Sequence, residues 1–411
     1  MEQALSLVKG GEALPSVEAL AKRLQRAAIE QKPLRVKLGL DPTRPDLHLG
    51  HSVVLKKLRA FQDLGHHAIL IIGDATALIG DPSGKNETRP PLSAAEIAVN
   101  AQTYLDQAGK IIDVRKATLA RNSDWLSPMT LADLLRLAAR ATVAQILERD
   151  DFSKRYADGR PIYLHELFYP LMQGYDSTQV DADVELGGSD QRFNNLMGRE
   201  LQSADGKPDP QIVVLAPLLE GTDGKIKMSK SYPEHCINLT DSPEDFYGKL
   251  MSIPDEMIAR YELLLTPMSE AQIAQQVEMM QRPADQGGVN PRDVKATLAK
   301  WLVSQYFSIE EADSVEQAFI RRFRHKEIPD AMPEVSAPAD TDLSLSALMT
   351  EHGISPSRSE ARRLIVGGGV RLDGEKVSDP DLAICRAAGD CLTLQVGKRR
   401  FLRLRFDAAT G

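Results

Sequence analysis

The sequence has few cysteines and no long apolar stretch. Its three cysteines, Cys236, Cys385 and Cys391, are scattered, which matches neither the spacing of zinc ligands nor a disulfide framework. The longest apolar run of strand type, Ala68 to Ile72, is far shorter than the roughly 20 residues that cross a bilayer. Residues 1–12 lack the basic and then apolar pattern of a signal peptide. We therefore expect a reduced, cytoplasmic protein with no membrane partner.

Several catalytic and repetitive patterns are missing as well. Gly80 to Lys85 is one residue too short for a P-loop, and Asn86 stands where that motif requires Ser or Thr. The sequence has no Gly-x-Ser-x-Gly element, no internal repeat and no low-complexity block. These absences argue against P-loop enzymes, serine hydrolases of that type and repeat proteins.

The composition is that of a globular protein with unevenly placed charge. Hydrophobic residues make up 42% and charged residues 26% of the chain, which is ordinary for a soluble protein. Its 411 residues predict roughly two to four domains. Residues 343–411 hold eleven Lys and Arg against eight Asp and Glu, a net of +3, so the total of −8 leaves −11 for the rest. This relatively basic part permits a phosphate-binding module.

The first half of the chain alternates expected strands with expected helices. A strand ends at Asp41, a helix covers His51 to Leu64, and a second strand covers Ala68 to Gly73. Residues 74–84, rich in glycine, are expected to form a loop, and Leu131 to Leu147 a helix.

Two further strands are expected in this half, one through Val184 and Leu186 and one from Ile212 to Ala216. Such alternation predicts an α/β fold with a parallel sheet covered on both faces. Ligands of such sheets bind at the carboxyl ends of the strands.

The second half follows a different pattern. It becomes mainly helical after about residue 232, and a stretch rich in Pro, Ala and Asp, Pro329 to Thr341, is expected to be a linker. Beyond it, Leu343 to His352 and Ser357 to Val366 are expected to be helices, followed by a glycine break at residues 367–369. Two hairpins are then expected, over residues 370–377 with an Asp-Gly turn and over residues 392–406 with a turn at Gly397.

Two separated motifs indicate nucleotide chemistry. His48 and His51 begin the expected helix, where ring N–H groups and backbone amides favour anions, and Gly50 lets a nucleotide approach the backbone. Residues 227–231, Lys-Met-Ser-Lys-Ser, place Lys227 and Lys230 in a loop, where mobile positive charges can follow a phosphate group. Taken singly, the histidines could be ordinary polar loop residues and the lysines a solvated basic loop. Together, in this order, the motifs resemble the two signatures of class I aminoacyl-tRNA synthetases.

A third group of residues bears on the substrate. Tyr169, Gln173 and Asp176 share one helix face, where a buried carboxylate and amide would be costly without a polar ligand. The alternative is a helix with one polar face in solvent. Gly187 to Gln191 follow at a strand end, where Asp190 can accept hydrogen bonds from a ribose.

This arrangement resembles the bacterial tyrosyl-tRNA synthetases over essentially the whole chain. The resemblance implies activation of L-tyrosine with ATP to tyrosyl-adenylate, release of pyrophosphate, and transfer of tyrosine to the 3' end of tRNA(Tyr). It implies Mg²⁺ bound through the ATP phosphates, no protein-bound metal, and a homodimer. Its implied tyrosine-binding residues are Asp41, Asp81, Tyr169, Gln173, Asp176 and Gln191. Its implied ATP-binding residues are Gly50, Gly188, Asp190, Met228, Ser229 and Lys230. Its implied catalytic residues are Thr43, His48, His51, Lys85, Arg89, Lys227 and Lys230.

One position departs from the best-known members of this family. They carry a tyrosine that helps to bind the phenol hydroxyl, whereas this sequence has Lys37 there, in Lys-Leu-Gly-Leu-Asp. A second bacterial branch shares the Lys-Leu-Gly pattern, so the resemblance is to that branch. The group that accompanies Asp176 at the phenol stays open.

The C-terminal part resembles the RNA-binding domain first recognised in ribosomal protein S-four. Arg358, Arg362 and Arg363 lie within about one helical turn and can meet a phosphate backbone, although a solvated basic helix would look similar. The glycine break and the Asp-Gly turn favour the RNA-binding interpretation. The implied domains are a Rossmann-like catalytic domain with a helical insertion (1–231), a helical anticodon-binding domain (232–328), a linker (329–342) and this RNA-binding domain (343–411). Rival interpretations are a tryptophanyl-tRNA synthetase and a catalytically silent RNA-binding paralogue.

Overall fold

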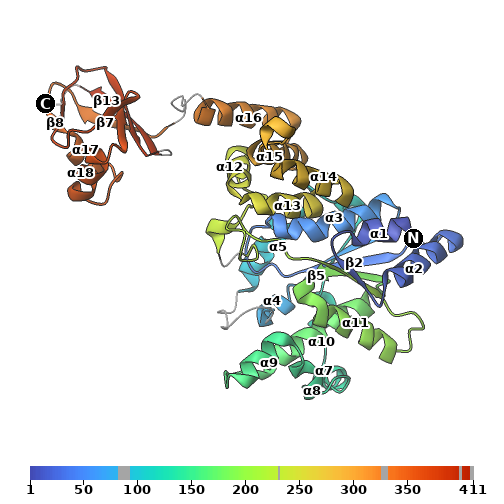
Figure 1. The fold of residues 1–411 in the computed structure, drawn as a ribbon. Coiled ribbons are helices and arrows are strands. Elements are labelled where there is room, and N and C mark those ends of the chain that lie inside the picture. The colour runs from blue at the N-terminus through green and yellow to red at the C-terminus, as the bar shows by residue number, and fades with distance from the viewer. Residues whose placement is uncertain (82–92, 230–231, 325–331, 398–399, 408–411) are drawn as a thin grey trace. The chain divides into compact units, whose positions relative to one another are not determined.

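The chain forms two compact units. The structure, a computed structural model, describes residues 1–81, 93–229, 232–324, 332–397 and 400–407. The first unit covers Met1–Glu316 and the second Gln317–Gly411. Each unit has a β-sheet of its own (Figure 1).

The sheet of the first unit has six strands in the order β1-β6-β5-β2-β3-β4. All neighbouring strands are parallel except β1, which pairs antiparallel with β6. The structure confirms the four strands expected from the sequence, β2, β3, β5 and β6. Their sequences are apolar because strands of a parallel sheet are buried on both faces. The bounds are Glu12–Leu14 (β1), Arg35–Leu40 (β2), His67–Ile72 (β3), Thr118–Arg121 (β4), Val184–Gly188 (β5) and Ile212–Ala216 (β6).

The strand order reverses between β2 and β5. From β2 the chain passes through α3 (Leu49–Asp63) to β3, while from β5 it passes through α11 (Arg192–Ala204) to β6 on the other side. Because such crossovers are right-handed, α3 and α11 cover opposite faces of the sheet, as Figure 1 shows. Helix α10 (Leu164–Gln179) packs along α11. A crevice at the carboxyl ends of β2 and β5 follows from this reversal.

A buried ion pair joins the two strands at the reversal. Lys37 on β2 lies opposite Glu185 on β5 in the parallel register, and its Nζ is 2.9 Å from Glu185 Oε1. Nζ also donates to Ser177 Oγ (2.8 Å) and to the Gln173 carbonyl oxygen (3.0 Å), both on α10. Lys37 is fully buried, so this cation ties helix α10 to both strands from inside the core.

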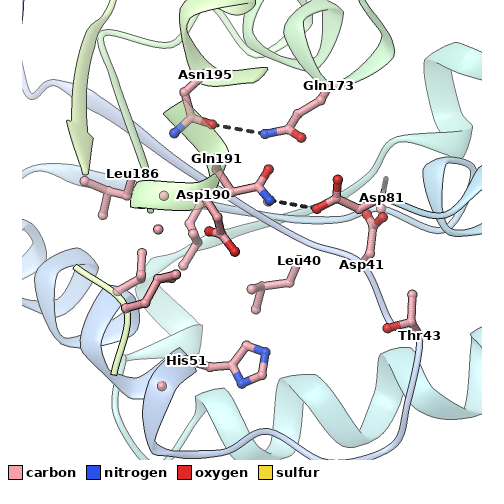
Figure 2. Close-up of a pocket in the computed structure, with 18 of the residues that line it drawn as sticks. Leu40, Asp41, Thr43, His51, Asp81, Gln173, Leu186, Asp190, Gln191 and Asn195 are labelled. Atoms are coloured by element: carbon pink, nitrogen blue, oxygen red, sulfur yellow. Dashed lines mark hydrogen bonds between the residues drawn. The ribbon is translucent and has the colours of Figure 1, made fainter. Parts of the chain in front are cut away.

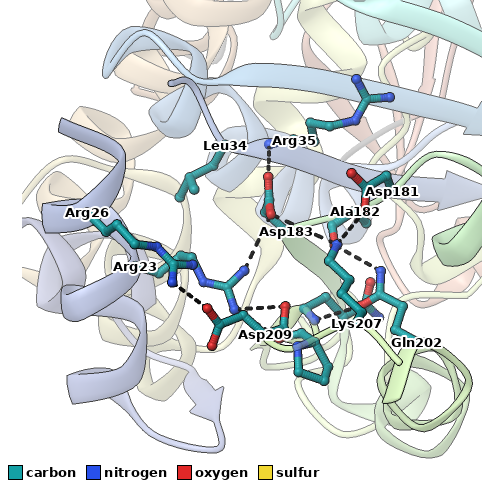
Figure 3. A network of polar contacts seen from close by, with 12 residues as sticks. Arg23, Arg26, Leu34, Arg35, Asp181, Ala182, Asp183, Gln202, Lys207 and Asp209 are labelled. Carbon is teal, nitrogen blue, oxygen red and sulfur yellow. Dashed lines mark hydrogen bonds and ion pairs between the residues drawn. The ribbon is translucent and has the colours of Figure 1, made fainter. Parts of the chain in front are cut away.

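Charged side chains also hold the opposite, amino-terminal ends of the strands (Figure 3). Asp183, just before β5, accepts from the backbone N–H of Arg35 (3.0 Å) and from Arg23 NH1 (3.4 Å). Arg23 lies on α2 (Val17–Glu30) and donates as well to the carbonyl oxygens of Asp209 and Pro210, before β6. This network holds together the amino-terminal ends of β2, β5 and β6, at the opposite end of these strands from the crevice.

The segments between β3 and α10 differ from two expectations. Residues 74–81, expected to be loop, contain the one-turn helix α4 (Thr76–Ile79). The single helix expected over residues 131–147 is two helices, α7 (Leu131–Ala138) and α8 (Val143–Leu147), because Thr142 forms a capping box with Gln145 and starts a new helix. The other helices here are α5 (Ala94–Ala108), α6 (Ser123–Leu126) and α9 (Asp150–Ala157).

The expectation of mainly helical structure after residue 232 is confirmed as far as α16. Lys56 joins this region to α3, a helix that covers the sheet. Its Nζ donates to the Leu265 carbonyl oxygen (2.6 Å) at the end of α13 and lies 4.8 Å from the ring centroid of Trp301 on α15. Burial lowers the pKa of Lys56 to about 8. The helices are α12 (Pro243–Ser252), α13 (Ile258–Leu265), α14 (Glu270–Gln281), α15 (Pro291–Tyr306) and α16 (Ile309–Arg324).

The second unit has a five-stranded sheet in the order β10-β9-β12-β13-β7. Both expected hairpins are confirmed: β9 (Val370–Leu372) turns into β10 (Glu375–Val377), and β12 (Cys391–Val396) pairs with β13 (Arg400–Asp407). Strand β7 (Glu334–Pro338) lies where the sequence predicts a linker, yet it pairs in parallel with β13 and so belongs to this sheet. The other helices and strands of this unit are β8 (Leu343–Ser344), α17 (Leu345–Glu351), α18 (Arg358–Val366) and β11 (Ala383–Ile384). The first unit also contains α1 (Glu2–Val8).

Among the helices that the structure describes, none has the length and apolar character needed to cross a membrane.

The buried ion pair generates a stability prediction. Replacing Lys37 with Met leaves Glu185 charged and uncompensated in the core, so we expect the free energy of unfolding to fall by about 3–5 kcal/mol. The double variant Lys37→Met, Glu185→Gln should lose less than Lys37→Met alone. Urea denaturation followed by circular dichroism measures both. As a control, Lys154→Met breaks an exposed pair with Asp150 and should cost under about 1 kcal/mol. An equal loss of unfolding free energy in Lys37→Met and Lys154→Met would contradict the structural role of Lys37.

Candidate functional site

A cavity of about 300 Å³ opens at the carboxyl ends of β2, β3 and β5, where the strand order reverses. Both signature motifs reach it, through His48 and His51 at the start of α3 and through Lys227 to Ser229 in a later loop. Tyr169, Gln173 and Asp176 line it from α10 (Figure 2 labels Gln173). The structure therefore brings together three groups of residues that are far apart in the sequence. The remaining expected residues in the lining are Asp41, Thr43, Gly50, Asp81, Gly188, Asp190 and Gln191.

The two histidines begin α3. His48 is the N-cap residue, and its backbone N–H donates to Nδ1 of His51 at 3.2 Å. A neutral imidazole that accepts at Nδ1 carries its proton on Nε2, which makes Nε2 the ring donor of His51. The positive end of the helix dipole adds to this donor. The start of α3 is thus arranged to receive an anion.

The second motif lies beside the first, since a Cβ placed on Gly50 would be 3.8 Å from Met228 Cβ. Leu49 N donates to the Ile237 carbonyl oxygen (3.0 Å), just beyond the Lys227 loop, and Met228 N donates to the Leu219 carbonyl oxygen (2.8 Å). Lys227 Nζ lies 2.9 Å from Asp190 Oδ2 across the cavity. A cation expected at the phosphates and a carboxylate expected at the ribose therefore pair with each other. Lys85, Arg89 and Lys230 lie outside the described residues.

A third acidic residue of the lining, Asp41, lies directly after β2. Its Oδ1 accepts from Thr76 Oγ1 (2.8 Å) and its Oδ2 from the Tyr169 hydroxyl (2.9 Å). Burial raises the pKa of Asp41 to about 7, with smaller opposing effects from these hydrogen bonds. Gly73 ends the neighbouring strand, and a Cβ there would lie 2.0 Å from Asp41 Oδ1. Only glycine leaves room for this carboxylate.

The structure identifies the groups that accompany Asp176. Trp125 Nε1 donates to its Oδ1 at 2.8 Å, and Asn122 Nδ2 donates to its Oδ2 at 3.3 Å. Burial raises the pKa of Asp176 to about 6, while the charge of Lys37 acts in the opposite direction. Lys37 itself is absent from the cavity lining and is bound to Glu185. The Asp176 carboxylate thus has an indole and an amide as hydrogen-bond donors, whereas the Lys37 ammonium binds Glu185.

Amide side chains organise the rest of this wall. Gln173 Nε2 donates to Asn195 Oδ1 (3.0 Å), and Gln191 Nε2 donates to Asp81 Oδ2 (2.7 Å); Figure 2 shows both contacts. Asn194 Nδ2 donates to the side-chain oxygens of Gln173 (3.0 Å) and Gln191 (2.9 Å). Every amide here has a defined orientation, which presents Asp81 and the Gln173 oxygen as acceptors near the cavity.

Sequence reasoning missed several of these residues. Asn122 follows β4, an edge strand of mostly exposed residues that lacks an apolar run. Its position at a carboxyl strand end would have been the signal, had that strand been recognised. Asn194 and Asn195 follow the Gly187–Gln191 loop and could have been included with it. Arg149, between α8 and α9, donates to Asp81 Oδ1 at 3.0 Å and carries no sequence signal, because only the fold brings it behind the cavity wall.

Together, the lining separates into two chemical halves. The histidines and Lys227 suit an anion, whereas Asp41, Asp81 and Asp176 suit donors such as an ammonium or a hydroxyl. Among the described residues, no group of three His, Cys, Asp or Glu side chains is placed to hold a metal ion. A zwitterionic amino acid beside a nucleotide matches this arrangement.

The C-terminal arginines stand on α18 and are all exposed. Arg362 forms a two-pronged ion pair with Asp381, and Arg363 lies 3.8 Å from Glu360. A phosphate that binds Arg362 or Arg363 therefore competes with these carboxylates for the guanidinium donors.

Comparison with known proteins agrees with this geometry. The profile of the family described as tRNA synthetases class I (W and Y) matches residues 29–324, and that of the S4 domain matches residues 345–387. A tyrosine–tRNA ligase of Carboxydothermus hydrogenoformans is 48% identical over 413 residues, covering 99% of this chain and 98% of the relative. One of Thermotoga maritima is 49% identical, covering 98% and 97%.

The fold is shared with solved structures too. A truncated mitochondrial tyrosyl-tRNA synthetase of Aspergillus nidulans superimposes with a TM-score of 0.63 at 22% identity, covering 78% of this chain and 93% of that one. The sequence relatives match almost the full length of the chain, and both are tyrosine enzymes, not tryptophan enzymes. The chain belongs to the tyrosine–tRNA ligase family of class I aminoacyl-tRNA synthetases.

Proposed function

We propose that the chain activates L-tyrosine with ATP, forming tyrosyl-adenylate and pyrophosphate, and then transfers tyrosine to the 3' end of tRNA(Tyr). One observation carries this proposal. A single cavity is lined by the two histidines at the start of α3, by the Lys227 loop and by the polar face of α10. Anion-binding groups and amino-acid-binding groups thus meet where a carboxylate and a phosphate would react.

Tyrosine lies in the half of the cavity lined by carboxylates. Its phenol hydroxyl donates to Asp176, which Trp125 and Asn122 hold in place. Its ammonium is bound by Asp81, by the Tyr169 oxygen and by the Gln173 oxygen, with Asp41 behind Tyr169. Gln191 lies near the substrate carboxylate, which points toward the nucleotide half.

ATP lies in the other half, near Gly50 and Gly188. Its ribose hydroxyls donate to Asp190, and its phosphates lie at His48, His51 and Thr43. Binding of ATP exchanges the contact between Lys227 and Asp190 for two contacts with the nucleotide, so the lysine is released toward the phosphates. By resemblance, Met228 and Ser229 also contact ATP, while Lys230, Lys85 and Arg89 meet the leaving pyrophosphate.

The reaction needs no side-chain nucleophile. An oxygen of the tyrosine carboxylate attacks the α-phosphorus in line, the bond to the bridging oxygen breaks, and pyrophosphate leaves with the electron pair. A terminal ribose hydroxyl of the tRNA then attacks the carbonyl carbon, and AMP leaves. Positioning and charge stabilisation supply the catalysis. Mg²⁺ enters bound to the ATP phosphates and neutralises part of their charge.

The same proposal covers the other parts of the chain. The catalytic domain spans residues 1–231 and the anticodon-binding domain residues 232–328. The RNA-binding domain includes β7 as well as residues 343–411, because this strand pairs with β13. Arg358, Arg362 and Arg363 then contact the tRNA backbone, with Asp381 displaced from Arg362. The match of residues 345–387 to the S4 domain supports this assignment.

The enzyme is proposed to be a homodimer in the cytoplasm. The helical insertion exposes large apolar side chains on α7, α8 and the start of α10, which a partner subunit would cover. All three cysteines are free thiols, as a reducing compartment preserves them. Sedimentation as a monomer at micromolar concentration would contradict the dimer. The exposed apolar residues are Leu131, Leu135, Val143 and Leu164.

Tyrosine-dependent exchange of pyrophosphate into ATP tests the function directly. We expect exchange with L-tyrosine, and none above background with L-tryptophan at equal concentration, because Asp176 and its two donors are arranged for a hydroxyl. Absence of exchange with tyrosine would indicate a silent paralogue. Exchange with tryptophan alone would reverse the substrate assignment.

Trp125 supports a sharper prediction about specificity. Replacing it with Phe removes a hydrogen bond of 2.8 Å to the Asp176 carboxylate while keeping an aromatic ring. We expect the preference for tyrosine over phenylalanine, measured as the ratio of kcat/KM in pyrophosphate exchange, to fall about tenfold or more. The control is Trp301→Phe, which changes the indole stacked on Lys56 and should leave that ratio unchanged. An unaltered ratio in Trp125→Phe would contradict the role of this indole.

Asp41 predicts a pH dependence of tyrosine binding. Because its pKa is raised to about 7 in the free enzyme, it holds a proton below that pH, and the incoming ammonium favours the ionised form. Binding at pH 6 should therefore release a proton and be about tenfold weaker than at pH 8. Calorimetry in buffers of different ionisation enthalpy measures both effects. In Asp41→Asn the difference in affinity should shrink to about twofold, the change left by Asp176 with its pKa of about 6; an undiminished slope in that variant would exclude Asp41 as its source.

A further inference from the structure

Four side chains form a closed ring of hydrogen bonds behind the ammonium end of the cavity. Arg149 NH2 donates to Asp81 Oδ1 (3.0 Å), and Arg149 NH1 donates to Asn194 Oδ1 (3.0 Å). Asn194 Nδ2 donates to Gln191 Oε1 (2.9 Å), and Gln191 Nε2 donates to Asp81 Oδ2 (2.7 Å), the last contact visible in Figure 2. Asp81 and Gln191 line the cavity, whereas Arg149 and Asn194 stand behind them.

The ring also reaches Gln173. Asn194 Nδ2 donates to Gln173 Oε1 at 3.0 Å, and Gln173 Nε2 donates to Asn195 Oδ1 at 3.0 Å. A carbonyl oxygen has two lone pairs, so Gln173 Oε1 keeps one for a ligand. The orientation of the Asn194 amide thus decides which end of the Gln173 amide acts as an acceptor near the cavity.

Arg149 is suited to set this orientation. A guanidinium has only donors, while an amide offers a donor at one end and an acceptor of similar shape at the other. By donating to Asn194 Oδ1, Arg149 directs Nδ2 toward Gln191 and Gln173. A tyrosine ammonium also has donors only, so it requires the acceptors that this arrangement presents. With the Asn194 amide reversed, Gln173 would turn its NH₂ group toward the ammonium.

We propose that Arg149 is a positioning residue for tyrosine, which acts through Asn194 and Asp81 to make the ammonium subsite accept hydrogen bonds. This inference rests on the proposed function and extends it to the insertion, since Arg149 lies between α8 and α9. Arg149 is only 4% exposed, so its charge acts in a region of low dielectric. It touches no reacting atom and is not a catalytic residue.

A purely structural role for Arg149 has to be distinguished. Its Nε lies 2.7 Å from Asp151 Oδ1, and its guanidinium stacks 5.3 Å from the Phe152 ring centroid. Arg155 provides a matched control in the same insertion. Arg155 is 8% exposed and is paired with Glu166, and its Cζ lies 5.9 Å from the Phe152 ring centroid. It is not one of the four residues that form the closed ring of hydrogen bonds.

Two ligands that differ only in the ammonium test the proposal. Tyramine carries the phenol and the ammonium, whereas 4-ethylphenol carries the phenol alone. We expect Arg149→Met to weaken tyramine binding about tenfold to a hundredfold and 4-ethylphenol binding by less than about threefold, with dissociation constants measured by NMR titration. Arg155→Met should lower the melting temperature yet leave the ratio of the two constants as in the wild type. Equal weakening of both ligands in Arg149→Met, or the same loss of ratio in Arg155→Met, would overturn the proposal.

A second variant keeps the test decisive if Arg149→Met does not fold. Asn194→Asp has the same shape and still accepts from Arg149, but it cannot donate to Gln191 or Gln173. We expect the ratio to move in the same direction as in Arg149→Met, and an unchanged ratio in a folded Asn194→Asp would overturn the proposal. Failure of the wild type to bind L-tyrosine would instead contradict the proposed function, so the two failures are distinguishable.

Discussion

The buried contact between Lys37 and Glu185 is the interaction on which the site depends. It joins β2 to β5 where the strand order reverses, and the carboxyl ends of both strands line the cavity. The same ammonium binds Ser177 and the Gln173 carbonyl oxygen, so it also ties α10, the helix of Tyr169, Gln173 and Asp176, to the sheet. A charge in the core is tolerated because every hydrogen of the ammonium has an acceptor.

The charges that line the cavity differ in sign from those buried behind its wall. Asp41, Asp81 and Asp176 line the amino-acid half of the cavity, and burial raises the pKa of two of them, Asp41 and Asp176. The compensating charges, Lys37 and Arg149, lie behind the wall, where they hold carboxylates and amides in place without occupying the cavity. A zwitterion with a neutral phenol therefore meets acceptors at its ammonium and at its hydroxyl. The phosphate half, at the start of α3, offers donors instead.

Much of the fold was predictable because it depends on local pattern. The apolar runs of β2, β3, β5 and β6 and the turn at Asp373 are read from neighbouring residues alone. Two predictions of secondary structure were wrong, because the local sequence pattern there differs from the structure that the folded chain adopts. A continuous helical pattern over residues 131–147 is interrupted by a cap at Thr142, and β7 forms from a stretch with a linker-like composition because β13 offers it an edge to pair with.

The sequence by itself determined the family and much of the cavity lining, because His48 to His51 and residues 227–231 are contiguous motifs and Tyr169, Gln173 and Asp176 share one helix face. Only the tertiary structure decided the partners of those residues. Asn122, Trp125 and Arg149 come from segments distant along the chain. Their side chains reach Asp176 and Asp81 only once β4, α6 and the segment between α8 and α9 have packed beside the cavity. Hydrogen bonds between distant segments leave no periodicity in a sequence, so the polarity of the cavity wall is a property of the fold.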